Sequence, residues 1–400
     1  MGACGNQLRN LAGTSVIAGM LELLATADTD VQAGLIKLLG VIGDARAATA
    51  ILRSCRNEQL VPQCIQALRE LQAVDDTFFS QEYDGADDSE RATILRMCGE
   101  IESCDLERLA RRGLADSSPQ VREAALRVVG ARGLTRLLDD CAGLLSDFDF
   151  DVRYLALDTL SQLAVHDATA IGALACRLVA GGVAQRRDAA CLFAAVADRQ
   201  HLAQLLKDED DQVRRSAVRG IAALGGDDVV HLLSLACTDE IADVRLAAVA
   251  ALGETARQDA VDPLLLALAD TDLWVRCAAL RSLGTLGSLT ALPAIRQVLA
   301  EDNELVVIAA LEALGQFSPE LSRELIRMAT QSKNDDVVRV ALDILAGWDD
   351  PWLDDHVEHL FMHRSWNVRI AAVQIIAHFR GPAAVPLLRL ALEREHDDLV

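Results

Sequence analysis

Aromatic residues and long apolar runs are both scarce in this sequence of 400 residues. Phe, Trp and Tyr make up 4% of the chain, whereas Ala and Leu, both good helix formers, dominate it. The composition therefore favours helices over strand-rich folds. No stretch approaches the ~18 apolar residues of a membrane-spanning helix, and no basic segment precedes an apolar one as in a secretory signal. We expect no membrane insertion and a cytoplasmic location.

Paired cysteines and catalytic motifs are missing as well. The ten cysteines are spread singly, with no C-x-x-C pair, which fits neither a zinc module nor a disulfide framework and favours reduced thiols. The sequence has no glycine-rich phosphate loop in a strand-to-helix context, no G-x-S-x-G elbow and no H-E-x-x-H. These absences predict a protein that is not an enzyme and holds no cofactor.

Charge is distributed unevenly between the two signs. Acidic residues outnumber basic ones by 60 to 38, and the formal net charge is −22. The mean field of such a chain repels phosphate backbones and anionic lipid surfaces. We therefore expect another protein, and not nucleic acid, as the partner.

One phrase recurs along the chain at a constant interval. Residues 239–253 read DEIADVRLAAVAALG and residues 270–284 read DTDLWVRCAALRSLG. The first Val of the V-R-x-A-A-L pattern, which we call the marker, returns every 31 residues from Val213 onward. The markers are Val121, Val152, Val213, Val244, Val275, Val306, Val337, Val368 and Leu399, and weaker copies of the phrase begin at Glu90, Leu60 and Val31. The repeat covers essentially the whole chain.

The marker phrase predicts an amphipathic helix. Val275, Ala279 and Leu283 recur at helical spacing and share one face, which predicts a buried stripe. A glycine follows late in each copy, and we expect it to form a left-handed cap, because that conformation disfavours a Cβ. These glycines are Gly130, Gly253, Gly284 and Gly315.

Another helix is predicted upstream of each marker phrase. Residues 261–270 read VDPLLLALAD, with Pro263 in the first turn, where a missing N–H costs nothing. Asp270 and Asp272 follow, and we expect them to cap the helix that carries the marker. Each repeat therefore predicts a first helix, an acidic turn and a second helix.

A helix pair of this size cannot bury its apolar stripe alone, so successive pairs are expected to stack into a solenoid. The pattern of a helix ending in L-x-x-A-L, an Asp-bearing turn and V-R-x-A-A-L-x-x-L-G resembles the HEAT repeat, especially the short bacterial type also seen in phycobilisome lyase subunits. We expect an all-α fold, an α-solenoid of about twelve HEAT-like helix pairs that forms a right-handed superhelix. It is expected to be a single solenoid over residues 1–400.

Two places interrupt the rhythm. Between Val152 and Val213 two repeats occupy 61 residues rather than 62, and the glycines in this interval indicate either a flexible joint near residues 180–186 or only a rearranged loop. In the other place, Phe79 and Tyr83 take positions held by Leu elsewhere, and we expect them in the core. The acidic residues around them form either a solvated face or a contact for a basic partner.

The last residues of the sequence reproduce a first helix with Leu387 and Leu388, followed by an acidic turn and the marker Leu399. A second helix is expected to begin there, because solenoid repeats need a neighbour or a polar cap to cover their apolar side. We expect the 400 residues to be a fragment of a longer array. The alternative is that another chain covers the open end.

Nearly every basic residue is Arg, and one set of arginines directly follows the marker. We expect each of these to pair with the turn Asp of its own or the next repeat, so that the pairs form a ladder. The predicted ladder arginines are Arg122, Arg153, Arg214, Arg245, Arg276 and Arg369.

A second set of arginines lies one turn further along, away from the buried stripe. Since the second helices of HEAT-like solenoids line the concave side, we expect this set to edge an inner groove and to bind carboxylates of a partner. In later repeats apolar residues take the comparable position. The alternative is a row of ordinary solvated residues. The predicted partner-binding residues are Arg96, Arg127, Arg215, Arg219, Arg281, Leu246, Ile308 and Ile370.

Two further residue types carry weaker hypotheses. His359 and His363 have the spacing of helical metal ligands, but alignment with Leu266 gives His359 a solvent-facing position, so we expect no metal there. The cysteines take positions held elsewhere by Val, Ala or Leu, as Cys98 does for Val129, and we expect them to be small buried hydrophobes. Attachment of a cofactor to one thiol is the alternative.

The sequence thus predicts a non-enzymatic scaffold or adaptor that holds an acidic or amphipathic segment of another protein, since solenoids expose large curved surfaces. The rival hypothesis follows from the resemblance to phycobilisome lyase subunits: attachment of a bilin-like cofactor, or a role as an assembly chaperone. The rival requires a reactive, exposed thiol or carboxylate in the groove.

Overall fold

The computed structural model describes residues 14–71, 74, 76–101, 106–380 and 384–394. These residues form α-helices joined by short turns, and no strand occurs among them. The predicted all-α solenoid class is confirmed. The chain divides into two compact units, unit 1 with residues 1–198 and unit 2 with residues 199–400. The predicted single solenoid and its handedness stay predictions.

Unit 1 contains twelve α-helices in its described part. They are α2 (Thr14–Thr26), α3 (Thr29–Ile42), α4 (Ala48–Ser54), α5 (Val61–Glu70), α6 (Asp76–Asp84), α7 (Asp88–Glu100), α8 (Leu106–Leu114), α9 (Pro119–Arg132), α10 (Leu138–Gly143), α11 (Phe150–Leu163), α12 (Ala168–Val179) and α13 (Val183–Ala195). Short 3₁₀ helices accompany them at Ala45–Ala47, Glu58–Leu60, Thr135–Leu137 and Leu144–Ser146.

Unit 2 contains thirteen α-helices over the residues described. They are α14 (Arg199–Leu205), α15 (Asp211–Leu224), α16 (Val229–Ala236), α17 (Ala242–Glu254), α18 (Val261–Ala267), α19 (Leu273–Leu286), α20 (Leu292–Val298), α21 (Glu304–Gly315), α22 (Pro319–Ala329), α23 (Asp335–Gly347), α24 (Trp352–Leu360), α25 (Trp366–Arg380) and α26 (Val385–Arg394). Two 3₁₀ helices lie at Gln258–Ala260 and Leu289–Ala291.

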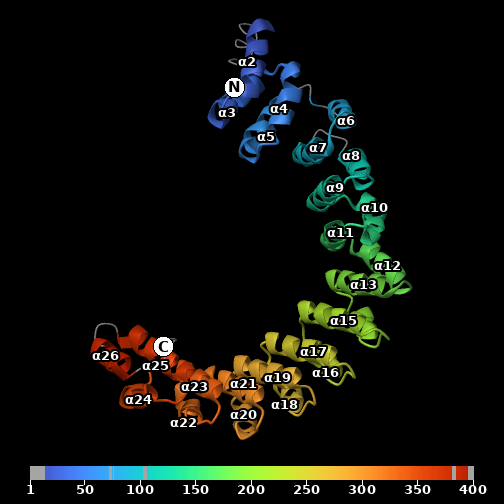
Figure 1. Ribbon diagram of the computed structural model, residues 1–400. Helices are drawn as coiled ribbons and strands as arrows, with labels where there is room; N and C mark the ends of the chain where they lie inside the picture. The colour runs from blue at the N-terminus through green and yellow to red at the C-terminus, as the bar shows by residue number, and fades with distance from the viewer. Residues whose placement is uncertain (1–13, 72–73, 75, 102–105, 381–383, 395–400) are drawn as a thin grey trace. The chain divides into compact units, whose positions relative to one another are not determined.

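Each unit is built of two helical layers. The even-numbered helices are the predicted first helices and the odd-numbered ones the second helices, and they alternate through twelve pairs before α26. Figure 1 shows the second helices α5, α7, α9 and α11 side by side in unit 1, with α6, α8 and α10 in the other layer. Unit 2 repeats this arrangement. The most extensive contacts join one second helix to the next, as between α19 and α21.

The core follows the marker phrase. The marker Val275 and its partners Ala279 and Leu283 are fully buried between α19 and its neighbours, as predicted. Burial of the larger of these side chains, Val275 and Leu283, contributes about 1.5–3 kcal/mol each. Phe79 and Tyr83 are also buried, so their predicted place in the core is confirmed.

The acidic turn works as a two-part cap. Asp272 is the N-cap residue of α19, and its carboxylate accepts from the backbone N–H groups of Trp274 and Val275 at 2.8 and 3.2 Å. Asp270 has a different role from the one predicted, because it accepts from the N–H of Asp272 at 2.8 Å and shapes the turn before the helix. The pattern D-x-D therefore combines a turn residue with a cap.

The four glycines predicted as left-handed caps are not caps, and that prediction is wrong. They lie within α9, α17, α19 and α21 and have no positive φ. The left-handed conformation occurs three residues later, at Gly133 and Gly287. A Cβ on Gly284 would lie 2.7 Å from the Cα of Ala313 in the next second helix. Glycine at this position thus permits second helices to approach closely.

The position of one arginine explains the shortened interval of 61 residues between Val152 and Val213. Arg186 donates to the carbonyl of Gly181 at 3.2 Å, as Arg153 does to that of Phe148 at 3.1 Å, so Arg186 takes the ladder position of α13. It lies 33 residues after Arg153 and 28 before Arg214. One repeat is therefore lengthened and the next shortened. Whether residues 180–186 act as a joint stays a prediction.

Some predictions fall on other parts of the chain. Cys4, Cys104 and the last marker Leu399 lie outside the described residues. Across the part of the chain that is described, no helix combines the length and apolar character needed to cross a membrane.

Candidate partner-binding surface

A ladder of ion pairs links successive repeats within each unit. Arg245 is typical: its Nη1 donates to the carbonyl of Asp239 in its own turn at 2.8 Å, and its Nε and Nη2 each reach the carboxylate of Asp270 in the next turn at 2.7 Å. The same 25-residue step recurs in the pairs Arg91–Asp116, Arg122–Asp147, Arg214–Asp239 and Arg276–Glu301. The predicted pairing with an Asp is confirmed for Arg122, Arg214 and Arg245, and the Asp comes from the next repeat. Arg276 pairs with a glutamate in place of the predicted Asp, and Arg91 joins the ladder although it was not predicted to. Arg153 donates to the carbonyls of Asp147 and Phe148 in its own turn.

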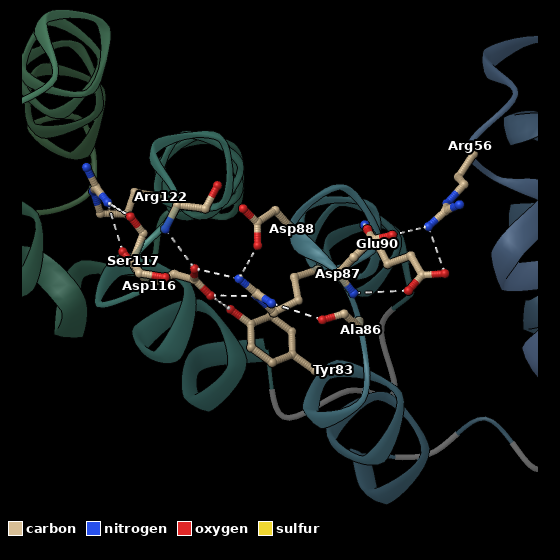
Figure 2. A network of polar contacts seen from close by, with 11 residues as sticks. Arg56, Tyr83, Ala86, Asp87, Asp88, Glu90, Asp116, Ser117 and Arg122 are labelled. Carbon is tan, nitrogen blue, oxygen red and sulfur yellow. Dashed lines mark hydrogen bonds and ion pairs between the residues drawn. The ribbon is translucent and has the colours of Figure 1, made fainter.

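The ladder begins in a polar network around Tyr83 (Figure 2). The Tyr83 hydroxyl donates to Asp116 at 2.9 Å, and the same carboxylate accepts from Nε of Arg91 at 2.8 Å. Burial alone would raise the pKa of Asp116, but hydrogen bonds from Arg91 and from the N–H of Ser118 outweigh it and hold this pKa below its usual value. Such satisfied, half-buried groups fix the packing of repeats and are not free to bind a partner.

A hollow of about 610 Å³ lies between α7 and α9 in unit 1. Two of the predicted partner-binding arginines, Arg96 and Arg127, line it together. The other charged residues of the lining are Arg56, Arg132, Glu58 and Glu100. Within the lining itself four arginines thus face two glutamates, in a chain whose net charge is −22.

The four arginines of the hollow differ in how firmly they are held. Among the described residues, Arg96 donates only to a backbone carbonyl, that of Cys55, at 3.2 Å. Arg127 is 63% exposed and contacts Glu123 of its own helix at 2.8 Å, a kind of exposed pair that contributes little to stability. Arg132 is exposed, and within the described residues it has no hydrogen-bond or ion-pair partner. These guanidinium groups remain available to an incoming carboxylate.

Arg56 is the most constrained of the four. It donates to Asp87 at 2.7 Å and contacts Glu90 at 2.8 Å, the two residues that form the capping box of α7 (Figure 2). Asp87 and Asp88 thus take part in ion pairs, and both side chains remain 62% exposed. Sequence reasoning missed Arg56 and Arg132 as lining residues, because neither follows the marker at the expected spacing.

The other predicted residues lie on successive second helices of unit 2. Arg215 is half-buried and lies 3.5 Å from Asp243, whereas Arg219 is exposed and, among the residues described, has no partner. Arg281 is exposed and pairs with Glu312 at 3.1 Å. The three apolar residues Leu246, Ile308 and Ile370 are each partly exposed.

The histidine and cysteine hypotheses have separate outcomes. His359 is exposed, and His363 accepts from the N–H of Ser365. Neither belongs to the group of three ligand side chains that the described residues bring close together, which is Glu123, Asp149 and Asp151. That group is acidic, with Glu123 and Asp149 half-buried and Asp151 exposed, and no ion is assigned to it.

The cysteines divide by burial. Cys98 is buried as predicted, and so are four others. The prediction is wrong for Cys176 and Cys191, which are exposed on α12 and α13, and Cys237 is only half-buried. The other buried cysteines are Cys55, Cys64, Cys141 and Cys277.

Stacked helix pairs with an acid–arginine ladder define an α-solenoid of the repeat class. The HEAT repeats family matches residues 199–276, 261–346 and 322–400, which together cover half of the chain without a gap. The protein belongs to the HEAT-repeat family. No curated protein sequence matches the chain.

Solved structures of similar fold include a karyopherin. Kap121p shares 14% sequence identity at a TM-score of 0.53, over 97% of this chain and 51% of its own. Kap121p bound to the extreme C-terminus of the protein phosphatase Cdc14p gives 11% identity and 0.54, covering 96% and 55%. Kap121p bound to Nup53p gives 12% and 0.54, covering 92% and 48%. The chain spans about half the length of these karyopherin chains, and the likeness is one of fold.

Proposed function

We propose that this protein is a non-enzymatic scaffold or adaptor that binds an acidic or amphipathic segment of another protein on its second-helix layer. The observation that carries the proposal is the hollow between α7 and α9, where Arg96, Arg127 and Arg132 present guanidinium groups that are not committed to the ladder. A planar guanidinium forms paired hydrogen bonds with a carboxylate, and Arg is enriched where interfaces concentrate their binding energy.

Charge contrast gives this surface its selectivity. Most of the molecule repels an acidic partner, because the net charge is −22. Binding is therefore favourable only where arginines gather, and misplaced binding is opposed elsewhere. The association rate is expected to fall as salt screens the arginines.

Proteins of similar fold support the proposal by analogy. Two of the similar structures hold Kap121p bound to another protein, the extreme C-terminus of Cdc14p in one and Nup53p in the other. A HEAT solenoid can therefore hold a segment of another chain. The partner of the present protein is a separate question.

The test is an affinity capture with matched charge reversals. The immobilised chain and its double variant Arg96→Glu/Arg127→Glu are incubated with an extract of the source organism, and bound proteins are identified by mass spectrometry. A matched control, Arg136→Glu/Arg177→Glu, makes the same change of charge at exposed arginines near the first helices α10 and α12. We expect a polypeptide that the wild type and the control retain and the Arg96/Arg127 variant loses. Equal retention by all three proteins contradicts the proposal.

Cofactor attachment is the second candidate, and the exposed thiols of Cys176 and Cys191 favour it. Incubation of the chain with a linear tetrapyrrole, followed by denaturing electrophoresis, tests it directly. A coloured band that Cys176→Ser or Cys191→Ser removes supports attachment. A colourless band means that these thiols do not attach the pigment.

A further inference from the structure

Neighbouring second helices of unit 2 meet through two fixed positions. One is the second residue after the marker, and the other is the residue just before the marker of the next repeat. Arg215 and Asp243, which occupy these positions in α15 and α17, lie 3.5 Å apart. Cys277 in α19 donates from Sγ to the carbonyl of Leu305 in α21 at 3.7 Å. Both pairs are 28 residues apart in sequence.

The same 28-residue step relates Leu246 of α17 to Trp274 of α19, and the two residues occupy these same positions, so we infer that they are also neighbours. The pairs therefore join into one row that crosses the second-helix layer. Asp243, the first member on α17, pairs with Arg215, and from Leu246 of α17 to Ile308 of α21 every further member of this row is apolar. We call this row the apolar strip; its residues are Leu246, Trp274, Cys277, Leu305 and Ile308.

The strip is open to solvent at its largest side chains. Trp274 is 61% exposed and Leu305 is 52% exposed, while Leu246 and Ile308 are partly exposed and Cys277 is buried. At these positions α15 has Gln212 and Arg215, and α23 has Asp336 and Arg339. A single exposed leucine is ordinary, but contiguous apolar side chains rimmed by polar ones mark an interaction surface.

The two ends of the strip differ in charge. At the α15 end, Arg215 has only the long contact to Asp243, and Arg219 one turn further has no partner in the described part of the chain. At the α23 end, the single Arg339 lies 3.4 Å from Asp343 and 3.8 Å from Asp336, so that negative charge is in excess there. Two arginines therefore face one aspartate at the α15 end, and positive charge is in excess there.

We propose that the apolar strip binds an amphipathic segment of a partner protein, with its acidic residues over Arg215 and Arg219 and its aliphatic or aromatic side chains over Trp274 and Leu305. This inference rests on the proposed function. It specifies the chemistry of the bound segment and which end of the strip its acidic residues occupy. Trp is the residue most enriched where binding energy concentrates, because it buries a large area at little entropic cost.

The length of the segment follows from the helix spacing. Helices packed side by side lie about 10 Å apart, so the three steps from α15 to α21 span about 30 Å. An extended chain crosses this distance with about 9 residues, and an α-helix needs about 20. A peptide of 20 residues is therefore long enough in either conformation.

The test uses a displayed library of random 20-residue peptides, selected on the full 400-residue chain. We expect enriched peptides with acidic residues at one end and aliphatic or aromatic residues in the rest. Their affinity should fall at least tenfold for Trp274→Ser/Leu305→Ser. The matched control, Leu266→Ser/Leu289→Ser, removes two leucines of unit 2 that are 78% and 61% exposed, one on α18 and one before α20. It should bind like the wild type.

A second readout locates the peptide on the strip. Covering Trp274 should shift the protein's tryptophan emission to shorter wavelength, and Trp274→Phe should abolish the shift while keeping most of the affinity. Arg215→Glu/Arg219→Glu should weaken binding and reduce its salt dependence without unfolding the chain.

The outcomes separate this inference from the proposed function. If selected peptides bind the strip variant and the wild type equally, or if none is selected, the inference about the strip is overturned. The proposed function falls separately, when the Arg96/Arg127 variant retains every protein that the wild type captures.

Discussion

A guanidinium in the ladder serves two repeats at once, because it donates to a carbonyl of its own turn and to a carboxylate of the next. Arg122 donates to the carbonyls of Asp116 and Ser117 at 2.9 and 3.0 Å and to Asp147 at 2.7 Å. A lysine has a single ammonium group and lacks this fork. The geometry of the turn therefore favours arginine over lysine at the ladder position.

The ladder predicts a contrast between two aspartates of unit 1. Asp147 is 8% exposed and holds Arg122, which is itself 11% exposed, so Asp147→Ala leaves a buried cation unpaired and should lower the free energy of unfolding by about 3 kcal/mol. Asp139 is 82% exposed beside Arg177, and Asp139→Ala should change it by less than about 0.5 kcal/mol. Urea denaturation of both variants checks the contrast, and equal losses would rule out the ladder as a stabilising element.

The sequence predicts most of the ladder arginines and two of the four arginines in the hollow, Arg96 and Arg127, but not the other two. Position after the marker identifies Arg122, Arg214 and Arg245 correctly, because the repeat fixes their surroundings. Arg132 and Arg56 reach the hollow through the placement of neighbouring helices, which a single repeat does not encode. Trp274 carried a signal that was missed, since it stands at a position where most other repeats have Asp, Gln or Asn.

At the scale of helices, contact between second helices depends on glycine. A Cβ added at Gly253 or Gly284 would lie too close to an atom of the following second helix. Near the end of a helix, a glycine is compatible with either a left-handed cap or a close approach. The sequence alone does not distinguish these, because the cap stands only three residues further on.

Two glycine substitutions separate close approach from helix propensity. A Cβ at Gly284 would lie 2.7 Å from the backbone of Ala313, so Gly284→Ala should destabilise the protein by about 1–3 kcal/mol. Gly34 lies within α3 and would meet nothing within 4 Å, so Gly34→Ala should stabilise it by about 0.5–1 kcal/mol. Thermal unfolding measures both. If Gly284→Ala stabilised the protein, a Cβ would fit between the second helices and the close-approach explanation would be wrong.

At the scale of the whole molecule, buried carboxylates make stability depend on pH in two opposite ways. Burial raises the pKa of Asp188 to about 6, against the opposing effect of the Arg187 cation. The folded state then takes up a proton between about pH 6 and pH 4, the usual pKa of an unfolded Asp, and stability rises as pH falls through this window. At Asp147 and Asp116, hydrogen bonds from the ladder arginines outweigh burial and lower the pKa. Their contribution is complete above about pH 4 and is lost below it.

The free energy of unfolding should therefore pass through a maximum between about pH 4 and pH 6. Urea titrations at a series of pH values measure this profile. Asp188→Asn should flatten the rise between pH 7 and pH 5, whereas Asp147→Asn should flatten the fall below pH 4. A wild-type profile that falls steadily from pH 7 to pH 5 would contradict the assignment to Asp188.

The central claim is that the second-helix layer, and not the first-helix layer or the turns, receives the partner. Hydrogen–deuterium exchange of the chain, with and without the polypeptide that it captures, tests this claim most directly. We predict added protection on the second helices α7, α9, α15, α17, α19 and α21. The first helices α8, α10, α16, α18 and α20 should exchange at unchanged rates. Protection confined to the first helices would contradict the account.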